Sequence, residues 1–197
     1  MIFKKNKKFT NNCPTGIIRI IGGMWRGSKI LVPNRTALRP TPNRVRETLF
    51  NWLAPFIRGA HCLDCFAGSG ALGIEALSRA AASVTLIEQD RLISQQLLNK
   101  LQLLQTKQAQ VITTDTNLWL AHSSDANKFD IVFIDPPFNQ GMISKTVAFL
   151  EYYNHLAKKS WIYIETEKKG TYSIPINWKI YKEKVAGKVA YRLYLRT

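Results

Sequence analysis

The feature that most constrains this chain is a regular alternation of short apolar runs with longer amphipathic runs from residue 61 onward. The apolar runs predict strands at 61–66, 83–88, 110–114, 130–135 and 160–165. The amphipathic runs predict helices at 70–80, 91–105 and 141–156. Strands that alternate with helices at this spacing form a parallel sheet with helices on both faces. We therefore expect an α/β fold with a mostly parallel, Rossmann-like sheet.

Both ends of the chain depart from this alternation. Two strand-like runs at 177–184 and 188–196 flank Ala186-Gly187 and predict an antiparallel hairpin at the sheet edge. At the other end, residues 17–32 predict a second hairpin. A helix should follow from Thr41-Pro42, with the threonine hydroxyl as its N-cap. The predicted organisation is a basic tail (1–16), a hairpin and helix extension (17–59) and a main domain (60–197).

A glycine-rich turn follows the first predicted strand of the main domain. The pattern Gly68-x-Gly70-x-x-Gly73 matches the fingerprint of dinucleotide-binding turns, and Glu88 ends the next strand 20 residues after Gly68. This arrangement indicates a nucleoside-bearing cofactor, and it serves nicotinamide cofactors and S-adenosylmethionine equally. Asp115, after the third strand, is either an acceptor for an adenine amino group or an ordinary strand-ending residue.

A second motif, Asp135-Pro136-Pro137-Phe138, closes the strand at 130–135. Ligands of open α/β sheets bind beyond the carboxyl ends of the strands, which places this motif beside the glycine turn. The two prolines stiffen the loop and remove backbone donors. A carboxylate and a neighbouring carbonyl can then accept both hydrogens of a planar amino group, and Phe138 can stack on its ring.

The two cysteines of Cys62-x-x-Cys65 predict core residues rather than a metal or redox site. Residues three apart in a strand face opposite sides of a sheet, so the two thiols cannot bind one metal ion. The sequence also lacks a second Cys/His pair that would complete four ligands, and we expect no metal.

The charge of the chain is concentrated at its ends. The net charge is +15, of which residues 1–60 contribute +11 and residues 151–197 contribute +6, while residues 61–150 carry −2. Positive charge in the two terminal segments favours binding of a polyanionic partner such as nucleic acid. For residues 1–12 a basic solvated tail is the favoured explanation, whereas residues 19–58 favour nucleic acid. The candidate RNA-binding side chains of the extension are Trp25, Arg26, Arg39, Arg44 and Arg46. Salt bridges, or contact with the cofactor, remain alternatives for Arg44 and Arg46, as does a place in the hairpin core for Trp25.

Taken together, these segments resemble the RsmD family of bacterial 16S rRNA guanine-N2 methyltransferases. The resemblance runs from about residue 18 onward, and the motifs that carry it are Ile21-Gly22-Gly23, Trp25-Arg26-Gly27, Leu38-Arg39-Pro40-Thr41, Arg44 to Leu53, Asp64 to Gly70, Glu75 to Arg79, Asp135 to Phe138 and Glu183 to Gly187. It implies a class I methyltransferase fold that uses S-adenosylmethionine.

The resemblance also implies roles for individual residues. The cofactor would be held by Thr41, Asp64, Phe66, Ala67, Gly68, Ser69, Gly70, Glu88 and Asp115. The target guanine, which is guanine 966 in the family, would be held by Asp135, Pro136, Pro137 and Phe138. The expected partner is 16S rRNA in an assembling 30S subunit, and the expected enzyme is a cytoplasmic monomer without a membrane partner. The alternatives are a DNA adenine-N6 methyltransferase, a protein-glutamine methyltransferase, a nicotinamide-dependent reductase and a non-catalytic RNA-binding module.

Overall fold

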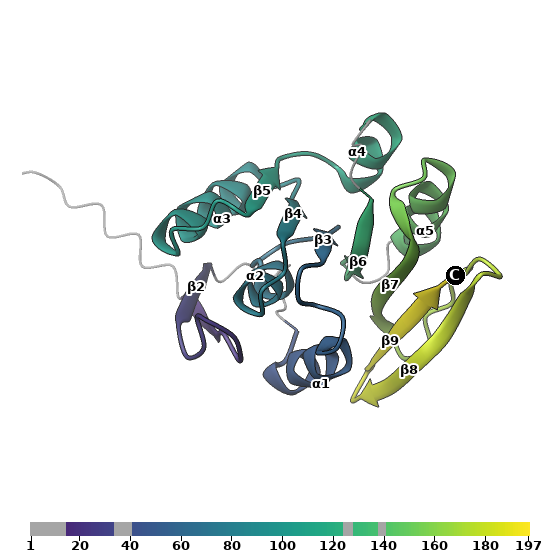
Figure 1. Ribbon diagram of the computed structural model, residues 1–197, viewed down its shortest axis with the longest axis horizontal. Coiled ribbons are helices and arrows are strands. Elements are labelled where there is room, and N and C mark those ends of the chain that lie inside the picture. Colours follow the sequence, from purple (N-terminus) through teal and green to yellow (C-terminus); the bar gives the residue numbers. More distant parts are fainter. Residues whose placement is uncertain (1–14, 34–40, 124–127, 138–140) are drawn as a thin grey trace, which may run out of the picture.

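The computed structural model describes residues 15–33, 41–123, 128–137 and 141–197, and its strands form two separate sheets (Figure 1). The small sheet is an antiparallel hairpin of β1 (Thr15–Arg19) and β2 (Lys29–Pro33). The large sheet has the order β5-β4-β3-β6-β7-β9-β8. Its parallel strands are β3 (His61–Asp64), β4 (Ser83–Ile87), β5 (Ala109–Ile112), β6 (Phe129–Ile134) and β7 (Leu156–Glu167). Its antiparallel edge is the C-terminal hairpin of β8 (Trp178–Ala186) and β9 (Val189–Arg196).

The helices cover both faces of the large sheet and create two apolar clusters. One cluster joins α1 (Asn43–Leu53), α2 (Ala71–Ser78) and α3 (Arg91–Leu103), together with Ile18, Ile20 and Ile30 of the small hairpin. The other cluster joins α4 (Thr116–His122) and α5 (Met142–Tyr152) on the opposite face. The sheet is therefore a buried layer between helices, which is the expected α/β architecture. The residues assigned to the extension share a core with the main domain.

The small hairpin is attached to α2 through its backbone. Glu75 of α2 accepts the backbone N–H groups of Ile21 and Gly22, both at 2.8 Å. The Ser78 carbonyl accepts the N–H of Met24 at 2.7 Å. Gly23 has a positive φ of 77°, and a Cβ at this position would lie 1.7 Å from the Ser78 carbonyl oxygen. The close approach of hairpin to helix therefore requires glycine at position 23.

Most predicted elements are confirmed, with one omission and one wrong cap. All the predicted strands and helices lie within a few residues of the observed ones, but β7 extends over twelve residues and α4 was not predicted. The predicted N-cap role of Thr41 is wrong. Helix α1 begins at Asn43 after Pro42 and has no side-chain cap, because the Thr41 hydroxyl bonds elsewhere.

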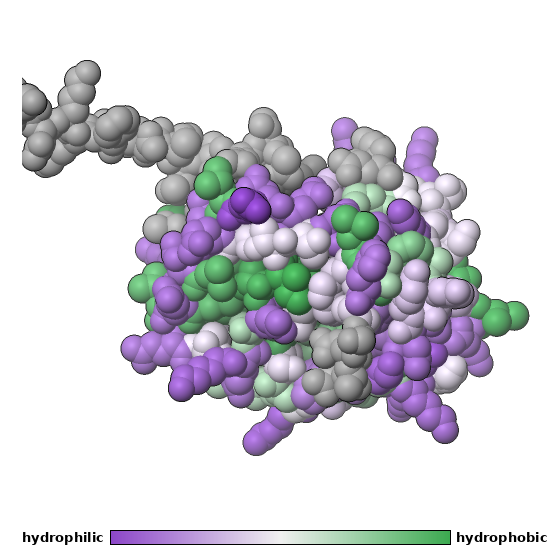
Figure 2. Space-filling model, turned by 90° about the horizontal axis from the view of Figure 1, so that it is seen from above, coloured by the Kyte–Doolittle hydropathy of each residue, from purple (hydrophilic) through white to green (hydrophobic). Residues whose placement is uncertain are grey.

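The surface is mixed in character. Seen from above, hydrophilic residues dominate the rim of the molecule, and a band of hydrophobic residues crosses the left half of this face (Figure 2). Leu92, Leu98 and Leu103 of α3 are exposed. None of the helices in the described ranges has the length and apolar character needed to cross a bilayer.

Candidate active site

A cavity of about 490 Å³ lies at the carboxyl ends of the central strands. Its walls come from the turns after β3, β4 and β6, from the start of α1 and from the tip of the C-terminal hairpin. This is the position at which open α/β sheets bind ligands. The sequence-predicted site residues that line it are Thr41, Asp64, Phe66, Ala67, Gly68, Ser69, Glu88, Asp115, Asp135, Pro136 and Pro137. Phe138, which was expected to stack on the target ring, falls outside the described residues.

The glycine turn and Glu88 form one wall of the cavity. Gly68 has a φ of 49°, and its N–H donates to Glu88 Oε2 at 2.9 Å. The other oxygen, Oε1, accepts the N–H of Asp90 at 2.8 Å. Burial raises the pKa of the Glu88 carboxyl, while these two donors lower it. Each carboxylate oxygen has a further lone pair, so Glu88 can still accept hydrogen bonds from a ligand's hydroxyl groups.

Gly70 was expected to hold the cofactor, but it does not line the cavity. It precedes α2 with a φ of 78°, and a Cβ there would lie 2.5 Å from Leu97 Cδ2. Gly73 is similarly enclosed, since its Cβ would lie 2.6 Å from Leu86 Cδ2. These two glycines allow α2 and α3 to pack closely against the sheet. Of the three glycines in the fingerprint, Gly68 is the one that adjoins the cavity.

A buried carboxylate lies beneath the glycine turn. Asp64, at the end of β3, is only 2% exposed, and its Oδ2 accepts the N–H of Gly73 at 3.0 Å. Burial raises the pKa of this carboxyl to about 7. The side chain of Lys100 on α3 donates to the Ser69 carbonyl at 3.1 Å. These two contacts brace the turn from both sides.

The opposite wall is built around Asp135. Thr41, from the segment before α1, donates its hydroxyl to Asp135 Oδ2 at 3.1 Å. Burial raises the pKa of Asp135 well above its ordinary value, and the neighbouring charge of Glu165 adds to this rise. The sequence predicts a contact between Thr41 and the cofactor. The structure shows a different contact, between the Thr41 hydroxyl and the predicted acceptor carboxylate.

Glu165 was missed by the sequence reasoning. It lies in β7 next to the end of β6, because Ile164 pairs with Ile134 in register. Its side chain is buried, lines the cavity, and accepts a hydrogen bond of 2.8 Å from the Tyr163 hydroxyl. A carboxylate directly after the apolar run 161–164 was the available signal, because a charge at the end of a buried strand is costly without a function.

Asp115 lines the cavity, but part of its acceptor capacity is already used. The residue caps α4, and its Oδ1 accepts the N–H of Leu118 at 3.0 Å. It follows the end of β5 by three residues, so it is not a strand-ending residue. An adenine contact remains a prediction for Asp115.

The two cysteines of the C-x-x-C are buried on opposite faces of the sheet, as predicted. Cys62 belongs to the cluster under α1 and α2, and Cys65 belongs to the cluster under α4 and α5. Burial raises the pKa of both thiols. In the described ranges, no three or more His, Cys, Asp or Glu side chains gather where they could hold a metal ion.

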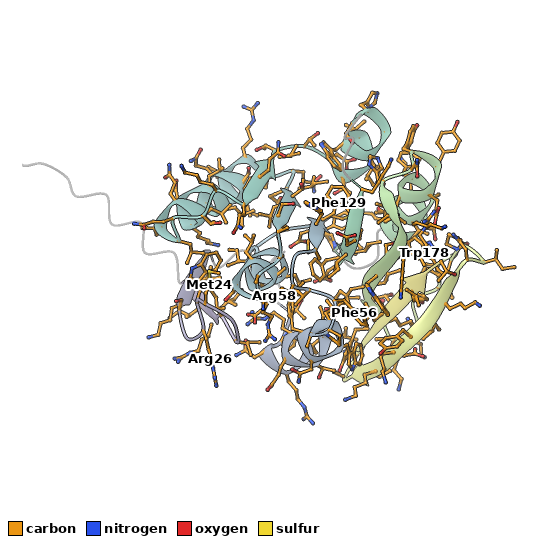
Figure 3. The ribbon with its side chains drawn as sticks, in the orientation of Figure 1. Met24, Arg26, Phe56, Arg58, Phe129 and Trp178 are labelled. Carbon is orange, nitrogen blue, oxygen red and sulfur yellow. The ribbon has the colours of Figure 1, made fainter. Side chains whose placement is uncertain are left out.

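Arg26, Arg44 and Arg46 do not line the cavity. Arg26 and Arg44 are exposed, and Arg26 projects outward from the small hairpin (Figure 3). Trp25 is half-buried and packs against the core cluster, which agrees with its alternative place in the hairpin core. Arg39 falls outside the described residues.

The prediction that Arg46 binds RNA is wrong for this structure. Its side chain is fully buried and donates to the Arg19 carbonyl at 2.9 Å and to Asn43 Oδ1 at 2.6 Å. Its third neighbour is Glu75, whose Oε2 lies 3.8 Å from Nη1. The helical periodicity correctly placed α1, but position 46 is on its inner side, so its charge is used to join α1 to α2.

The cavity has the size and donor–acceptor chemistry for a nucleoside-bearing cofactor. Its volume is within the range of about 300–1,000 Å³ that is usual for small-molecule sites. Glu88 offers acceptors for ribose hydroxyls, and the Gly68 turn lets a ligand approach the backbone closely. The residues present therefore fit S-adenosylmethionine.

The fold and the cavity together define a protein of the class I S-adenosylmethionine-dependent methyltransferase fold. A solved chain from Streptococcus mutans, a candidate SAM-dependent methyltransferase, has this fold with a TM-score of 0.67 at 13% identity, covering 93% of this chain and 55% of that chain. At such low identity the likeness concerns the fold alone.

Closer relatives identify the family. Residues 18–195 match the model of the family described as Conserved hypothetical protein 95. The Escherichia coli K12 protein named "Ribosomal RNA small subunit methyltransferase D" is 53% identical over 190 residues, which is 96% of this chain and 95% of that protein. The solved structure of yhhF from Escherichia coli has a TM-score of 0.83 at 54% identity and covers 92% of this chain and 98% of that chain. The chain belongs to the Conserved hypothetical protein 95 family, also called the RsmD family.

Proposed function

We propose that this chain transfers a methyl group from S-adenosylmethionine to the exocyclic N2 of a guanine in 16S rRNA, guanine 966 by resemblance to its family, within an assembling 30S subunit. The observation that carries the proposal is that one cavity brings the Gly68–Glu88 wall together with the Asp135-Pro136-Pro137 loop. A cofactor wall alone would also suit a reductase. An acceptor loop facing it suits transfer to an amino nitrogen.

The cofactor wall would hold S-adenosylmethionine through three groups. Glu88 would accept the ribose hydroxyls, and Asp115 would accept the adenine amino group through Oδ2. The backbone from Phe66 to Ser69 would contact the methionine portion. When bound, the cofactor supplies an electrophilic methyl group on its sulfonium. The cavity lies between α1, the glycine turn and the hairpin tip, which would flank that group.

Asp135 would hold the target amine. A guanine amino nitrogen is a weak nucleophile, because its lone pair is delocalised into the ring. Hydrogen bonds from its two hydrogens to Asp135 and to the Pro136 carbonyl favour a pyramidal nitrogen and direct the lone pair. The Thr41 hydroxyl donates to Oδ2, and Oδ1 would accept from the substrate amine. This positioning would account for much of the rate enhancement of methyl transfer.

The raised pKa of Asp135 also suits it to receive the surplus proton. During transfer the N2–methyl bond forms, the sulfur–methyl bond breaks, and the methylated nitrogen then carries one hydrogen too many. The carboxylate that accepts a hydrogen bond from this nitrogen can take that proton. Burial and the charge of Glu165 strengthen Asp135 as a base.

The proposal is tested by incubating the protein and labelled S-adenosylmethionine with four substrates in parallel: naked 16S rRNA, small ribosomal subunits, DNA and a protein extract. We expect label in rRNA, with the best yield from subunits, and N2-methylguanine after digestion. Label in DNA alone would indicate an adenine-N6 enzyme, label in protein alone would indicate a protein methyltransferase, and no label with any substrate would contradict the assignment.

Three variants test the role of the acceptor loop. Asp135→Asn keeps the volume of the side chain but offers one acceptor oxygen, and we expect at least about a hundredfold loss of kcat with cofactor affinity nearly unchanged. Thr41→Val removes the hydroxyl that orients Asp135, whereas Thr41→Ser retains it. The valine variant should lose activity and the serine variant should recover most of it.

A further inference from the structure

The C-terminal hairpin carries a group of cationic and aromatic side chains that the cavity does not use. Strand β8 is the edge strand of the large sheet, and every residue from Lys179 to Ala186 is exposed. Four of these residues, Lys179, Tyr181, Lys182 and Lys184, form what we call the lysine–tyrosine face.

A β-bulge places the members of this face on one side of the sheet. Lys179 pairs with Leu195 and Lys182 pairs with Leu193, with a shift in register between Ile180 and Lys182. In an unbroken strand, residues three apart face opposite sides. The extra residue, Tyr181, cancels this alternation and brings Lys182 to the same side as Lys179.

The side that the bulge selects is the one against which α1 packs. Leu193, Leu195 and Tyr191, the partners of the three lysines, belong to the apolar cluster shared with α1. The Tyr181 ring lies 4.9 Å from Trp161 and 6.4 Å from Phe56, between centroids. Phe56, just after α1, lies toward the C-terminal hairpin (Figure 3).

The opposite side of β8 has a different chemistry. It carries Ile180, Glu183 and Val185, and Glu183 pairs with Arg192 at 2.7 Å. The one acidic residue of β8 is thus turned away from the lysines and neutralised by its neighbour. As a result, the side toward α1 has three lysines and no carboxylate from β8.

Helix α1 extends this surface with an aromatic group. Trp52 is half-buried and stacks on Tyr191 at 5.5 Å between ring centroids. Arg44 and Glu47 of α1 are both exposed and carry opposite charges. The positive charge of this surface therefore comes from the lysines of β8, and α1 contributes a partly exposed aromatic ring beside them.

This surface leads directly into the cavity. Ala186 and Val189, at the tip of the hairpin, line the cavity together with Val45 of α1 and Asp135. Figure 1 shows the tip of the hairpin approaching α1. A strand whose base enters the cavity here would pass over the lysine–tyrosine face.

We propose that the lysine–tyrosine face binds single-stranded RNA next to the target guanine; this inference rests on the proposed function and adds the surface that holds its substrate. Lysines contact phosphates, and a tyrosine ring stacks on an unpaired base, which is the combination typical of single-strand binding. A base that enters a cavity must leave its stack, so its neighbours in the strand are unstacked and available to Tyr181.

The charge of the face is tested with a triple variant, Lys179→Gln with Lys182→Gln and Lys184→Gln. The matched control removes three exposed lysines of other elements: Lys107, Lys145 and Lys158. Binding of a fluorescent, guanine-containing single-stranded oligoribonucleotide is measured over a range of salt concentrations. The first triple should bind about tenfold more weakly and lower the slope of log Kd against log salt by about 2, at 0.7 per phosphate contact. The control should bind like the unaltered protein.

The ring is tested separately. Tyr181→Ala should weaken binding about tenfold, whereas Tyr181→Phe should retain it because the ring remains. Tyr152, which is 81% exposed on α5, provides the control Tyr152→Ala. Thermal unfolding and S-adenosylmethionine affinity, which the proposal expects to be unchanged, show that each variant is folded.

Several results would overturn the proposal. Equal affinities for the two triple variants would do so, as would an alanine variant of Tyr181 that binds like the phenylalanine variant. Polyglutamate that competes as well as RNA would indicate a general anion surface instead. Because binding is measured without methyl transfer, a protein that binds through this face but methylates no rRNA would contradict only the proposed function.

Discussion

Replacing Glu75 should detach the small hairpin from α2 and destabilise the whole protein. This carboxylate is fully buried, and both of its oxygens are occupied. Oε1 accepts the Gly22 N–H and Arg79 Nε, each at 2.8 Å, while Oε2 accepts the Ile21 N–H at 2.8 Å and lies 3.8 Å from Arg46 Nη1. Glu75→Gln preserves the shape of the side chain and changes only these interactions.

The cost can be worked out from this geometry. A glutamine amide has one acceptor oxygen, so its NH₂ group must face a backbone N–H, and a buried donor without a partner costs about 1–3 kcal/mol. The fully buried Arg46 also loses its counter-ion, and breaking a buried pair from one side costs about 3–5 kcal/mol. The two costs overlap, so we expect a loss of about 4 kcal/mol from the free energy of unfolding. This is a large fraction of the 5–15 kcal/mol that is typical of whole proteins.

A double-mutant cycle with Arg46→Met separates the charge pairing from the rest. Methionine is long, unbranched and apolar, so it can occupy the buried path of the arginine. Replacing both members of a buried pair costs far less than removing one. Equilibrium unfolding in urea should therefore give a coupling energy of about 2 kcal/mol or more between positions 46 and 75. Hydrogen exchange at Ile21 and Gly22 should become faster in Glu75→Gln.

The reasoning would be refuted by additive single effects, because additivity would mean that the buried charges do not sense one another. A free energy of unfolding for Glu75→Gln within about 1 kcal/mol of the unaltered protein would contradict the bonding argument as well. Arg79→Gln is the control. Its side chain is 18% exposed, and Glu75 keeps its two backbone donors and Arg46 in this variant, so a smaller loss is expected.

Three further predictions follow from the buried carboxylates and thiols. Burial raises the pKa of Asp64 to about 7, whereas the unfolded chain has a pKa of about 4 at this residue. The contribution of Asp64 to the free energy of unfolding is therefore complete below about pH 4 and is lost as the pH rises through about 7. Asp64→Asn should therefore gain stability over the unaltered protein at pH 8 and not at pH 4 in urea unfolding, and equal differences at both pH values would contradict this. The charge of Glu165 raises the pKa of Asp135, so Glu165→Gln should move the acidic limb of the kcat–pH profile to lower pH; an unmoved limb would contradict the coupling. Neither Cys62 nor Cys65 should react with iodoacetamide at pH 8 until the protein unfolds, as checked by mass spectrometry of digested peptides, because both thiols are buried and have raised pKa values.

The α/β fold could be predicted from the sequence because short apolar runs, typical of buried strands, alternate with longer amphipathic runs, typical of helices. The short helix α4 escaped prediction, since its seven residues are too few to establish a periodic pattern, although Asp115 followed by Thr116 is an ordinary helix start. The extended first half of β7 was missed because Lys158 and Lys159 are exposed and interrupt its apolar pattern.

The candidate site was predictable where one motif supplies the residues, and less so where separate segments meet. The Asp135 loop and the Gly68 turn could be read from local sequence. The bond from Thr41 to Asp135 joins residues 94 positions apart, and no local signal specifies it. Arg46 was misassigned because charge in a sequence predicts exposure, whereas a buried partner such as Glu75 becomes visible only in three dimensions.

The attachment of the small hairpin has a consequence for how this protein can vary. Helix α2 recognises residues 21–24 almost entirely through their backbone groups, with position 23 restricted to glycine. The outward side chains of the hairpin, such as Arg26, take no part in that recognition. Mutations can therefore change the chemistry that the hairpin presents to a partner while its position over the domain stays fixed, so that anchoring and recognition can evolve, or be engineered, independently.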